Sequence, residues 1–456
     1  MLFSSIEFIF FFLPLSLILY FAVPLRFRNA VLLGTSLLFY GWGEPIYVLL
    51  MIATVSADYI FGLLVARRRS RAWLAVAVIC NLASLGFFKY YDFFADLVGL
   101  PLLGLSLPVG ISFYTFQALS YVVDVYRGES PQKNAVAFGT YITMFPQLVA
   151  GPIVRYSDIK NELAARTSTA ERAASGILRF VTGLGKKVLL ANPAGEVFEH
   201  FSAMTGHGLG TLGAWVGILF YALQIYFDFS AYSDMAIGLG QILGFTFPEN
   251  FNYPYCADSI RDFWRRWHIS LSTWFREYVY IPLGGNRHGL PRTLLNMLIV
   301  WSLTGFWHGA GWNFLAWGLY YFLLLAAERL FLGRLLERLP RPLRHVYALF
   351  FILIGWVFFA HTDLSEALMY LGTMFGIYGP AAAVGEVYDL TRNALPLAIM
   401  LLGCTPLPRR LFWLYPENSS PLPRRIAVTL GTLMVLVLST AYLADSSYNP
   451  FLYFRF

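Results

Sequence analysis

Long apolar runs recur along the whole chain and give the first indication of its fold. A helix needs roughly 20 apolar residues to cross the hydrocarbon core of a bilayer, and its backbone groups must bond within the segment. Membrane β-strands would instead appear as alternating segments of about ten residues, whereas these runs are longer and continuously apolar. The pattern predicts helical segments near residues 3–25, 30–42, 46–66, 72–97, 99–126, 135–154, 173–190, 211–245, 293–312, 313–333, 346–360, 366–384, 394–406 and 426–444.

Several of these runs are too short to cross a membrane. We expect about 10–12 true crossings, with the other runs forming re-entrant or interfacial helices. The first run, Phe3 to Leu25, is too long for the core of a signal peptide and should remain as the first membrane helix. The chain shows no internal repeat and no loop long enough for a soluble domain. We predict an all-α polytopic membrane protein with a single domain over residues 1–456 and an aromatic tail at 448–456.

Composition agrees with a membrane protein. Of the 456 residues, 58% are hydrophobic, 18% are aromatic and 13% are charged, and the mean hydropathy is +0.59. Soluble domains carry about 25% charged residues. The net charge of +7 is modest and fits basic cytoplasmic loops, so no nucleic-acid partner is expected. Cys80, Cys256 and Cys404 lie far apart and form no CxxC pair, which argues against a zinc site or a disulfide framework.

The stretch from Arg261 to Gly289 combines arginines and aromatic residues at helical spacing, which predicts an amphipathic helix. One interpretation is a helix that lies in the headgroup plane with its arginines in water. The other is a helix that borders a polar cavity, with the arginines facing an anionic ligand. A turn at Pro282, Gly284 and Gly285 would end the helix. The apolar face comprises Trp264, Trp267, Leu271, Phe275 and Tyr278, and the basic face comprises Arg261, Arg265, His268, Ser272 and Arg276.

A single histidine, His308, interrupts a run that contains no Lys, Arg, Asp or Glu between Arg292 and Glu328. Ionisable groups within membrane segments are costly and tend to face a cavity or a partner, which makes His308 a functional candidate. The alternative is a neutral histidine that is hydrogen-bonded to a neighbouring helix or sits at the interface. A helix from Arg292 to His308 would be about 24 Å long, so His308 would lie deep in the bilayer or near its far surface.

Other polar residues carry weaker signals. Asp228 and Asp234 lie in an apolar segment and would either be paired or face a polar cavity, with a structural role favoured. The chain contains no GxSxG elbow, no P-loop and no HExxH sequence, so serine-hydrolase, nucleotide-hydrolase and zinc-protease functions lack support. The remaining histidines lie in or next to loops and are expected at the surface: His200, His207, His288, His345 and His361.

Several motifs in fixed order resemble those of one membrane enzyme family. They are FPQLVAGPIVRY (145–156), YFDFSAYSDMAIGLG (226–240), ENFNYPY (249–255), DFWRRWHISLSTWFREYVYIPLGGNR (262–287) and GFWHGAGWNFLAWG (305–318). Together they resemble the bacterial membrane-bound O-acyltransferase (MBOAT) family, in the branch of the alginate and peptidoglycan O-acetyltransferase membrane subunits. The resemblance implies a ring of membrane helices around a thinned centre, where a funnel and a tunnel meet. It also implies that His308 of the WHG motif is the signature catalytic residue and that His268 is its companion.

The resemblance further implies a membrane O-acetyltransferase component that moves an acetyl group from a cytoplasmic thioester donor, acetyl-CoA, across the bacterial inner membrane. The acceptor would be an exported polysaccharide of the alginate, cellulose or peptidoglycan type, reached through a periplasmic SGNH-hydrolase-like acetyltransferase partner. No bound cofactor and no metal are expected. Two alternatives stay open: a D-alanyl or other acyl transferase of cell-wall polymers, and a transporter or flippase with a histidine relay. A transporter would be expected to contain an internal repeat.

The candidate residues suit acyl transfer. An imidazole with a pKa near 6.5 can take the proton of an attacking hydroxyl at neutral pH, which is the role expected for His308. His268 would orient the acceptor or donate a hydrogen bond to the developing oxyanion. Arg261, Arg265 and Arg276 would hold the anionic phosphates of the donor.

The chain closes with the aromatic sequence YNPFLYFRF. One interpretation is an interfacial aromatic anchor, since such residues favour the boundary between lipid and water. The resemblance implies a second interpretation, an acyl relay in which Tyr453 accepts the acetyl group near His308 and passes it to an extracytoplasmic partner.

Overall fold

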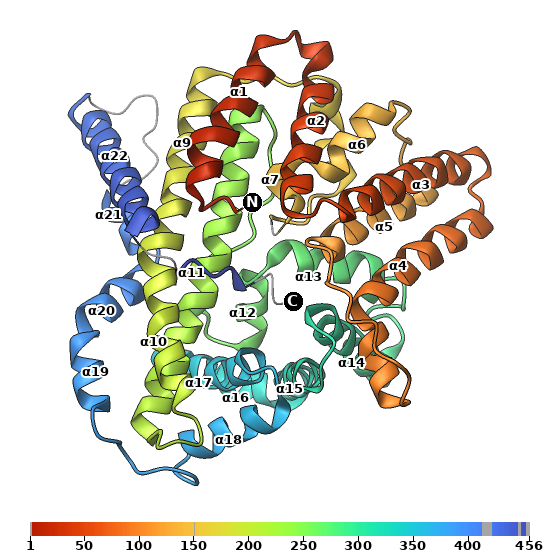
Figure 1. Ribbon diagram of the computed structural model, residues 1–456. Helices are drawn as coiled ribbons and strands as arrows, with labels where there is room; N and C mark the ends of the chain where they lie inside the picture. The colour runs from red at the N-terminus through yellow and green to blue at the C-terminus, as the bar shows by residue number, and fades with distance from the viewer. Residues whose placement is uncertain (1, 150, 413–421, 446–447, 453–456) are drawn as a thin grey trace. The chain divides into compact units, whose positions relative to one another are not determined.

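The computed structural model describes residues 2–149, 151–412, 422–445 and 448–452. Within these ranges the chain forms helices joined by turns and loops, without β-strands (Figure 1). The predicted all-α class is confirmed. The chain divides into two compact units. Unit 1 comprises Met1–Leu184, Tyr232–Glu249 and Leu436–Ser447, and unit 2 comprises Gly185–Ala231, Asn250–Val435 and Tyr448–Phe456.

Unit 1 contains the helices of the first 184 residues together with parts of α11 and α22. Short polar side chains start several of these helices, as at α4, where the side chain of Ser70 accepts a hydrogen bond from the backbone N–H of Trp73. The helices of its first segment are the π-helix η1 (Phe8–Phe12), α1 (Leu13–Ala22), α2 (Leu25–Gly43), α3 (Tyr47–Arg68), α4 (Arg71–Leu97), α5 (Ile111–Arg127), α6 (Ala135–Thr143), α7 (Phe145–Leu148), α8 (Tyr156–Ala164) and α9 (Ala170–Gly185).

Unit 2 contains most of the later helices. The long helix α11 begins where the buried carboxylate of Glu386 accepts hydrogen bonds from the backbone N–H groups of Gly210 and Gly213, at 2.6 and 3.0 Å. The helices are η2 (Lys186–Ala191), α10 (Asn192–Ala203), α11 (Thr211–Leu243), η3 (Pro254–Cys256), α12 (Ile260–Arg266), α13 (Ile269–Phe275), η4 (Arg276–Tyr280), α14 (Gly289–His308), α15 (Trp312–Ala327), η5 (Glu328–Leu332), α16 (Gly333–Leu336), α17 (Arg341–Ala360), α18 (Leu364–Met374), α19 (Glu386–Arg392), α20 (Ala394–Gly403), α21 (Leu407–Phe412) and α22 (Leu422–Asp445).

Six helical segments among the described residues are long and apolar enough to cross a membrane. Two shorter apolar segments, Phe8–Ala22 and Ala394–Gly403, fall below the length of a full crossing. These features agree with a multi-pass membrane protein, and the figure of about 10–12 crossings stays a prediction, as does the single domain over residues 1–456. The six segments are Tyr47–Arg67, Arg71–Leu97, Thr211–Leu243, Trp312–Leu336, Arg341–Ala360 and Leu422–Asp445.

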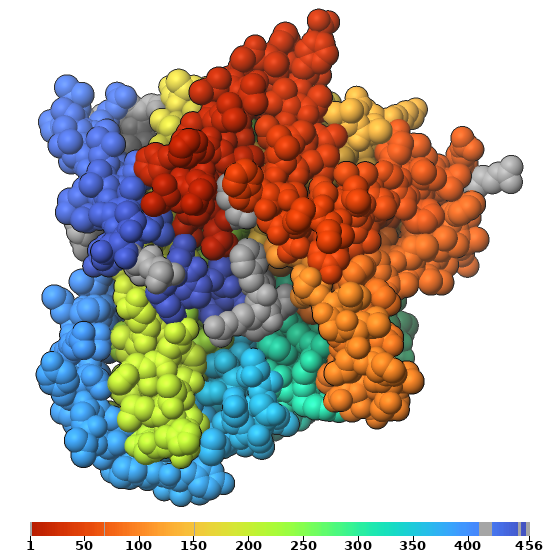
Figure 2. All heavy atoms as spheres, viewed as in Figure 1, coloured from red at the N-terminus to blue at the C-terminus, as the bar shows by residue number. Residues whose placement is uncertain are grey.

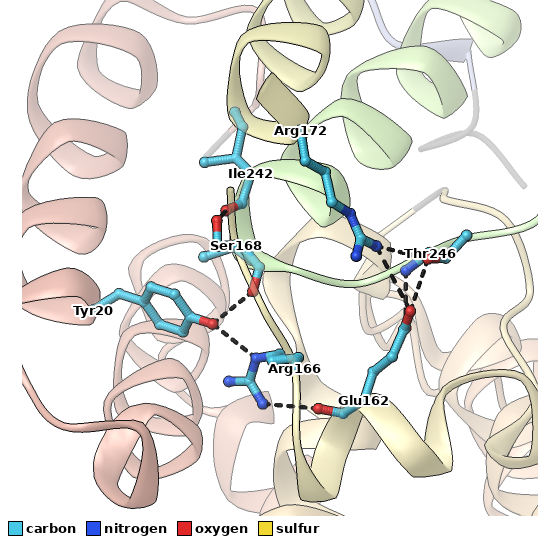
Figure 3. Close-up of polar contacts among 8 residues, drawn as sticks. Tyr20, Glu162, Arg166, Ser168, Arg172, Ile242 and Thr246 are labelled. Atoms are coloured by element: carbon cyan, nitrogen blue, oxygen red, sulfur yellow. Dashed lines mark hydrogen bonds and ion pairs between the residues drawn. The ribbon is translucent and has the colours of Figure 1, made fainter. Parts of the chain in front are cut away.

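A polar network within unit 1 joins α1 and α8 to the end of α11 (Figure 3), and Asn29 adds a contact with α2. Arg166 Nε donates to Tyr20 Oη at 2.7 Å, and Arg166 Nη1 donates to Asn29 Oδ1 at 2.7 Å and to the carbonyl of Glu162 at 3.2 Å. Tyr20 Oη donates in turn to the carbonyl of Leu243 at 2.6 Å. Because Arg166 is 6% exposed, the hydrogen bonds from Nε and Nη1 replace part of the water that its guanidinium group loses on burial.

Both aspartates of the apolar segment 211–245 are paired, as predicted. In unit 1, Asp234 accepts hydrogen bonds from Nε and Nη2 of Arg179 at 3.0 and 2.9 Å. In unit 2, Asp228 forms an ion pair with Lys187, with 2.8 Å between Oδ1 and Nζ. The prediction of a paired role is therefore confirmed for both residues.

The described C-terminal residues, 448–452, pack within unit 2. The backbone N–H of Leu452 donates to Oδ2 of Asp228 at 2.9 Å, and Nζ of Lys187 donates to the carbonyl of Pro450. The last two described side chains are buried. In Figure 2 the dark blue spheres of this segment lie against the yellow-green spheres of α10. The predicted aromatic tail is thus part of a packed interior up to Leu452, and Tyr453 lies outside the described residues.

Candidate active site

His308 is the last residue of α14, one member of a closely packed pair of helices. Three residues connect α14 to α15, and the glycine contacts between the two helices show that they run antiparallel. Gly305 of α14 faces Gly318 of α15. A Cβ atom on Gly305 would overlap the carbonyl oxygen of Phe314, and one on Gly318 would overlap that of Trp301. Small residues allow helix backbones to meet in this way, so the contact fixes the position of His308 relative to α15.

Aromatic rings surround His308, which is only 4% exposed. The imidazole lies edge-on to the rings of Trp307, Trp317 and Phe359, at centroid distances of 4.9, 5.0 and 5.0 Å. Such edge-to-face contacts favour one ring orientation. His308 is therefore enclosed by protein rather than exposed at a membrane surface.

The helix predicted from Arg261 onward is interrupted, which corrects the sequence-based expectation. Trp267 is extended and His268 has left-handed backbone angles, φ 44° and ψ 55°, so α12 and α13 are separate helices. Asn250 provides the physical reason. Its carbonyl accepts the N–H of Ile269 and its side chain accepts the N–H of Ser270, so the first amides of α13 bond outside the helix.

His268 is buried between aromatic rings from two other helices. The ring of Phe229 from α11 lies edge-on at 4.6 Å, and the ring of Trp307 from α14 lies at 6.0 Å. Trp307 therefore contacts both histidines. Burial lowers the pKa of His268 to about 3, because removal from water disfavours the charged imidazolium. The ring is neutral at physiological pH.

One pocket of about 420 Å³ brings the predicted site residues together. Both His268 and His308 line it, and so do the three predicted arginines, Arg261, Arg265 and Arg276. Most of the remaining lining side chains are apolar or aromatic. Two interpretations were open for the stretch from Arg261 to Gly289. The arrangement favours a segment that borders a cavity over a helix that lies in the headgroup plane. Other residues of the lining include Trp264, Leu271, Phe275, Met297, Val300 and Leu325.

A second pocket, of about 450 Å³, is polar and rich in arginine. Arg261 and Arg265 line both pockets. Two of its five arginines pair with its two aspartates at 2.9 and 3.0 Å. Among the described residues, the guanidinium groups of Arg261, Arg265 and Arg341 form no ion pair, although the carboxylate of Glu328 accepts the backbone N–H of Arg261 at 3.0 Å. The pocket therefore carries excess positive charge. Its charged lining consists of Asp258, Arg261, Asp262, Arg265, Arg266, Arg341 and Arg344.

One expected surface histidine is buried. His361 is 6% exposed and its ring lies 4.9 Å from that of Tyr370, so the prediction of a surface position was wrong. The reason is that the end of α17 packs inside unit 2, where Asn313 Nδ2 donates to the carbonyl of His361 at 2.8 Å. Burial lowers the pKa of His361 to about 4. His361 does not line the histidine pocket.

The site also contains residues that the sequence did not single out. Asn250 and Trp307 stand inside recognisable motifs, ENFNYPY and GFWHGAGWNFLAWG, but their contacts with His268 depend on how distant segments meet. Arg341 and Arg344 lie in the first turn of α17, at the end of an arginine-rich stretch of the sequence. The sequence shows the basic composition of this stretch but does not show that it lies close to α12.

Comparison with known proteins assigns the family. Residues 128–370, a range that contains both histidines, match the family model described as MBOAT, membrane-bound O-acyltransferase family. The chain belongs to this family. A protein named "Probable alginate O-acetylase AlgI" from Azotobacter vinelandii is 36% identical over the full length of both chains. The peptidoglycan O-acetyltransferase of Helicobacter pylori is 35% identical over 83% of this chain and 80% of its own.

A more distant relative is the teichoic acid D-alanyltransferase of Bacillus subtilis, 29% identical over 49% of this chain and 59% of its own. Membership of the membrane-bound O-acyltransferase family makes this chain a multi-pass membrane acyltransferase. The resemblance seen in the motifs and the predicted enzyme class are confirmed. The transporter alternative loses its support.

Proposed function

We propose that this acyltransferase transfers an acetyl group from a cytoplasmic thioester for the O-acetylation of an exported polysaccharide, and that it does so in the bacterial inner membrane. The observation that carries the proposal is the single pocket lined by His268 and His308. Relatives named as an alginate O-acetylase and a peptidoglycan O-acetyltransferase support acetyl as the acyl group and a polysaccharide as its destination. The teichoic acid relative supports a D-alanyl group as the alternative.

The reaction needs a base and a pocket that excludes water. His308 takes the proton of the attacking hydroxyl group while the hydroxyl oxygen bonds to the carbonyl carbon of the thioester. The C–S bond then breaks, and the imidazolium returns the proton to the leaving sulfur. The aromatic rings around His308 keep water from the thioester, which limits its hydrolysis.

Acetyl-CoA is the proposed donor, since its phosphates suit the arginine-rich pocket. Guanidinium groups bind phosphate through charge and paired hydrogen bonds. Because Arg261 and Arg265 line both pockets, the two pockets are adjacent, and a donor with phosphates in the polar pocket would lie next to the histidine pocket. Arg341, at the start of α17, supplies a further cation without a carboxylate partner among the described residues.

We further propose that Tyr453 carries the acetyl group to an extracytoplasmic partner, an SGNH-hydrolase-like acetyltransferase. The attachment of the preceding residue supports this relay. Leu452 is bonded to Asp228, and the next residue of α11, Phe229, has its ring 4.6 Å from that of His268. The described end of the chain is thus held beside the wall of the histidine pocket.

The test of the proposed function is acetyl transfer by purified protein and its His308→Ala variant. We expect the variant to lose at least about a hundredfold in rate, the contribution typical of general-base catalysis. His361→Gln is the matched control, because it removes a buried histidine of the same unit that does not line the pocket. Wild-type transfer by a well-folded His308→Ala variant would refute the role of His308.

The donor assignment is tested with a truncated substrate. Arg265→Gln and Arg341→Gln should raise KM for acetyl-CoA and leave KM for acetyl-pantetheine unchanged, because the truncated thioester lacks the phosphates that these arginines bind. The exposed Arg292, which lines neither pocket, gives the control variant Arg292→Gln. Equal effects on both donors would contradict phosphate binding in the polar pocket.

The relay is tested by mass spectrometry of the C-terminal peptide from cells that lack the extracytoplasmic partner. An acetylated Tyr453 is the expected species, since the group has no onward acceptor there. Unmodified peptide in such cells, or wild-type polysaccharide acetylation by Tyr453→Phe, would count against the relay while leaving the acyl-transfer proposal intact.

A further inference from the structure

A cluster of three arginines lies at and near the turn between α1 and α2 in unit 1. The guanidinium carbon of Arg28 lies 5.1 Å from the centre of the Tyr20 ring, and that of Arg166 lies 5.4 Å from the centre of the same ring. Arg26, which precedes Arg28 in the first turn of α2, stacks over the ring of Phe27 at 4.8 Å. Two guanidinium groups therefore share one aromatic ring, and a third lies close to them in the chain.

The described residues provide no counter-ion for this arginine cluster. Among them, Arg26, Arg28 and Arg166 form no ion pair. The carboxylate of Glu162 pairs instead with Arg172, at 3.6 Å (Figure 3). Like charges that share one ring repel each other, and the repulsion grows where protein and lipid replace water. An anion from outside the chain would relieve this repulsion.

Arg166 supplies the buried charge of the cluster. It is 6% exposed, and its Nε and Nη1 are hydrogen-bonded, but its Nη2 has no hydrogen-bond partner among the described residues (Figure 3). The Nε of Arg28 is likewise buried without a partner. A buried charge is costly unless an opposite charge compensates it. An anion bound by the more accessible arginines would stabilise Arg166 through its field, without direct contact with Nη2.

The surroundings of Arg26 and Arg28 favour a lipid over a dissolved anion. Phe21, Leu25 and Phe27 flank the two arginines in the sequence and are 42%, 43% and 48% exposed. Exposed apolar side chains suit the acyl region of a membrane, and arginines beside them reach the headgroups. A soluble anion would gain nothing from these apolar side chains, whereas a phospholipid contacts both kinds of residue.

We propose that Arg26 and Arg28 bind the phosphate of an anionic phospholipid at the turn between α1 and α2, beside the fixed charge of Arg166. Arg26 is exposed and Arg28 is partly exposed, so a headgroup can reach both. Guanidinium groups bind phosphate through charge and paired hydrogen bonds. The site contains no residue of the histidine pocket, so it does not depend on the proposed acyl transfer.

Native mass spectrometry of the full chain in detergent tests the site with two lipids that have the same acyl chains. We expect dioleoyl-phosphatidylglycerol to bind at least tenfold more tightly than zwitterionic dioleoyl-phosphatidylcholine. The double variant Arg26→Gln, Arg28→Gln should bind phosphatidylglycerol about twentyfold more weakly, since each arginine near an anionic headgroup contributes roughly fivefold. Unchanged binding by this variant would overturn the proposal. Equal binding of the two lipids by the wild type would overturn it as well, without need of any variant.

The double variant Arg67→Gln, Arg71→Gln is the matched control, because it removes two exposed arginines of the same unit outside the cluster. It should bind phosphatidylglycerol as the wild type does. An equal loss in both double variants would show that total charge attracts the lipid, and the assignment to Arg26 and Arg28 would be wrong.

Thermal unfolding separates a lipid from a dissolved anion. Phosphatidylglycerol should raise the melting temperature of the wild type, because a ligand that binds only the folded protein stabilises it. Inorganic phosphate at the same concentration should leave the melting temperature unchanged. An equal rise with inorganic phosphate would mean that the cluster takes a free anion, and this result would overturn the lipid assignment.

Discussion

Lys187 and Asp228 form an ion pair in the interior of unit 2, with 2.8 Å between Nζ and Oδ1 and only 3% of each side chain exposed. The C-terminal segment completes the polar contacts of both. Lys187 also donates to the carbonyl of Pro450, and Asp228 also accepts the N–H of Leu452. A buried pair is stable only when its remaining donors and acceptors are bonded, so the pair and the segment depend on each other.

Removal of one partner should therefore be far more damaging than removal of both. Asp228→Ala leaves an uncompensated ammonium group inside unit 2, and we expect a loss of about 3–5 kcal/mol. The double variant Lys187→Met, Asp228→Leu replaces both charges by apolar groups and should lose less. Thermal unfolding of the purified proteins in detergent compares them, and limited proteolysis reports release of the C-terminal segment. Equal stability of wild type and Asp228→Ala would contradict the argument.

The contact between α14 and α15 predicts a specific sensitivity at Gly305. An added Cβ would overlap the carbonyl oxygen of Phe314, so Gly305→Ala must push the helices apart and displace His308. We expect a loss of about 1–3 kcal/mol, typical of overpacking, together with reduced acyl transfer. Gly86→Ala is the control, since a Cβ on this glycine of α4 meets no atom within 4 Å. Similar behaviour of the two variants in thermal unfolding and activity assays would refute the prediction.

The sequence best predicted those helices and turns that depend on interactions between residues close together in the chain. The run at 211–245 is observed as the helix Thr211–Leu243, because a continuous apolar stretch must satisfy its backbone within itself. The turn after the basic helix also follows the prediction, since Gly284 and Gly285 both adopt positive φ angles. In both places the deciding interactions lie within a few residues along the chain.

The break at His268 could not be predicted in this way. Helical spacing continues smoothly through Trp267 and His268, and the interruption comes from Asn250, eighteen residues earlier in the chain. Burial of His361 likewise depends on where the end of α17 packs. The pairing of the histidines in one pocket is a tertiary property, and only the family resemblance, not the spacing, suggested it.

Arg166 offers a prediction about unit 1. Its guanidinium group bonds to Tyr20 through Nε and to Asn29 and the carbonyl of Glu162 through Nη1, an arrangement of two separate nitrogens that a lysine ammonium cannot reproduce. Arg166→Lys should therefore destabilise the protein by about 1–3 kcal/mol, the cost of leaving buried polar groups unsatisfied. Thermal unfolding provides the measurement. The exposed Arg292→Lys serves as the control, and equal melting temperatures for the two variants would contradict a structural role for the network.

Buried His361 predicts a dependence of stability on acid. Burial lowers its pKa in the folded protein to about 4, below the value of about 6.5 expected when the chain is unfolded. Between these values the unfolded chain binds a proton that the folded protein does not, so stability falls as pH falls below 6.5. At pH 5 the loss from this residue should reach about 2 kcal/mol.

The variant His361→Gln removes this proton-linked loss. Its melting temperature in detergent, measured from pH 8 to pH 4.5, should decline less steeply below pH 6.5 than that of the wild type. His207 is exposed, so His207→Gln should leave the slope unchanged. His268, which is also buried with a lowered pKa, remains in both variants and contributes equally to each curve. Parallel curves for wild type and His361→Gln would show that His361 is not kept neutral by burial, because a group whose pKa is unchanged on folding cannot alter the pH dependence of stability.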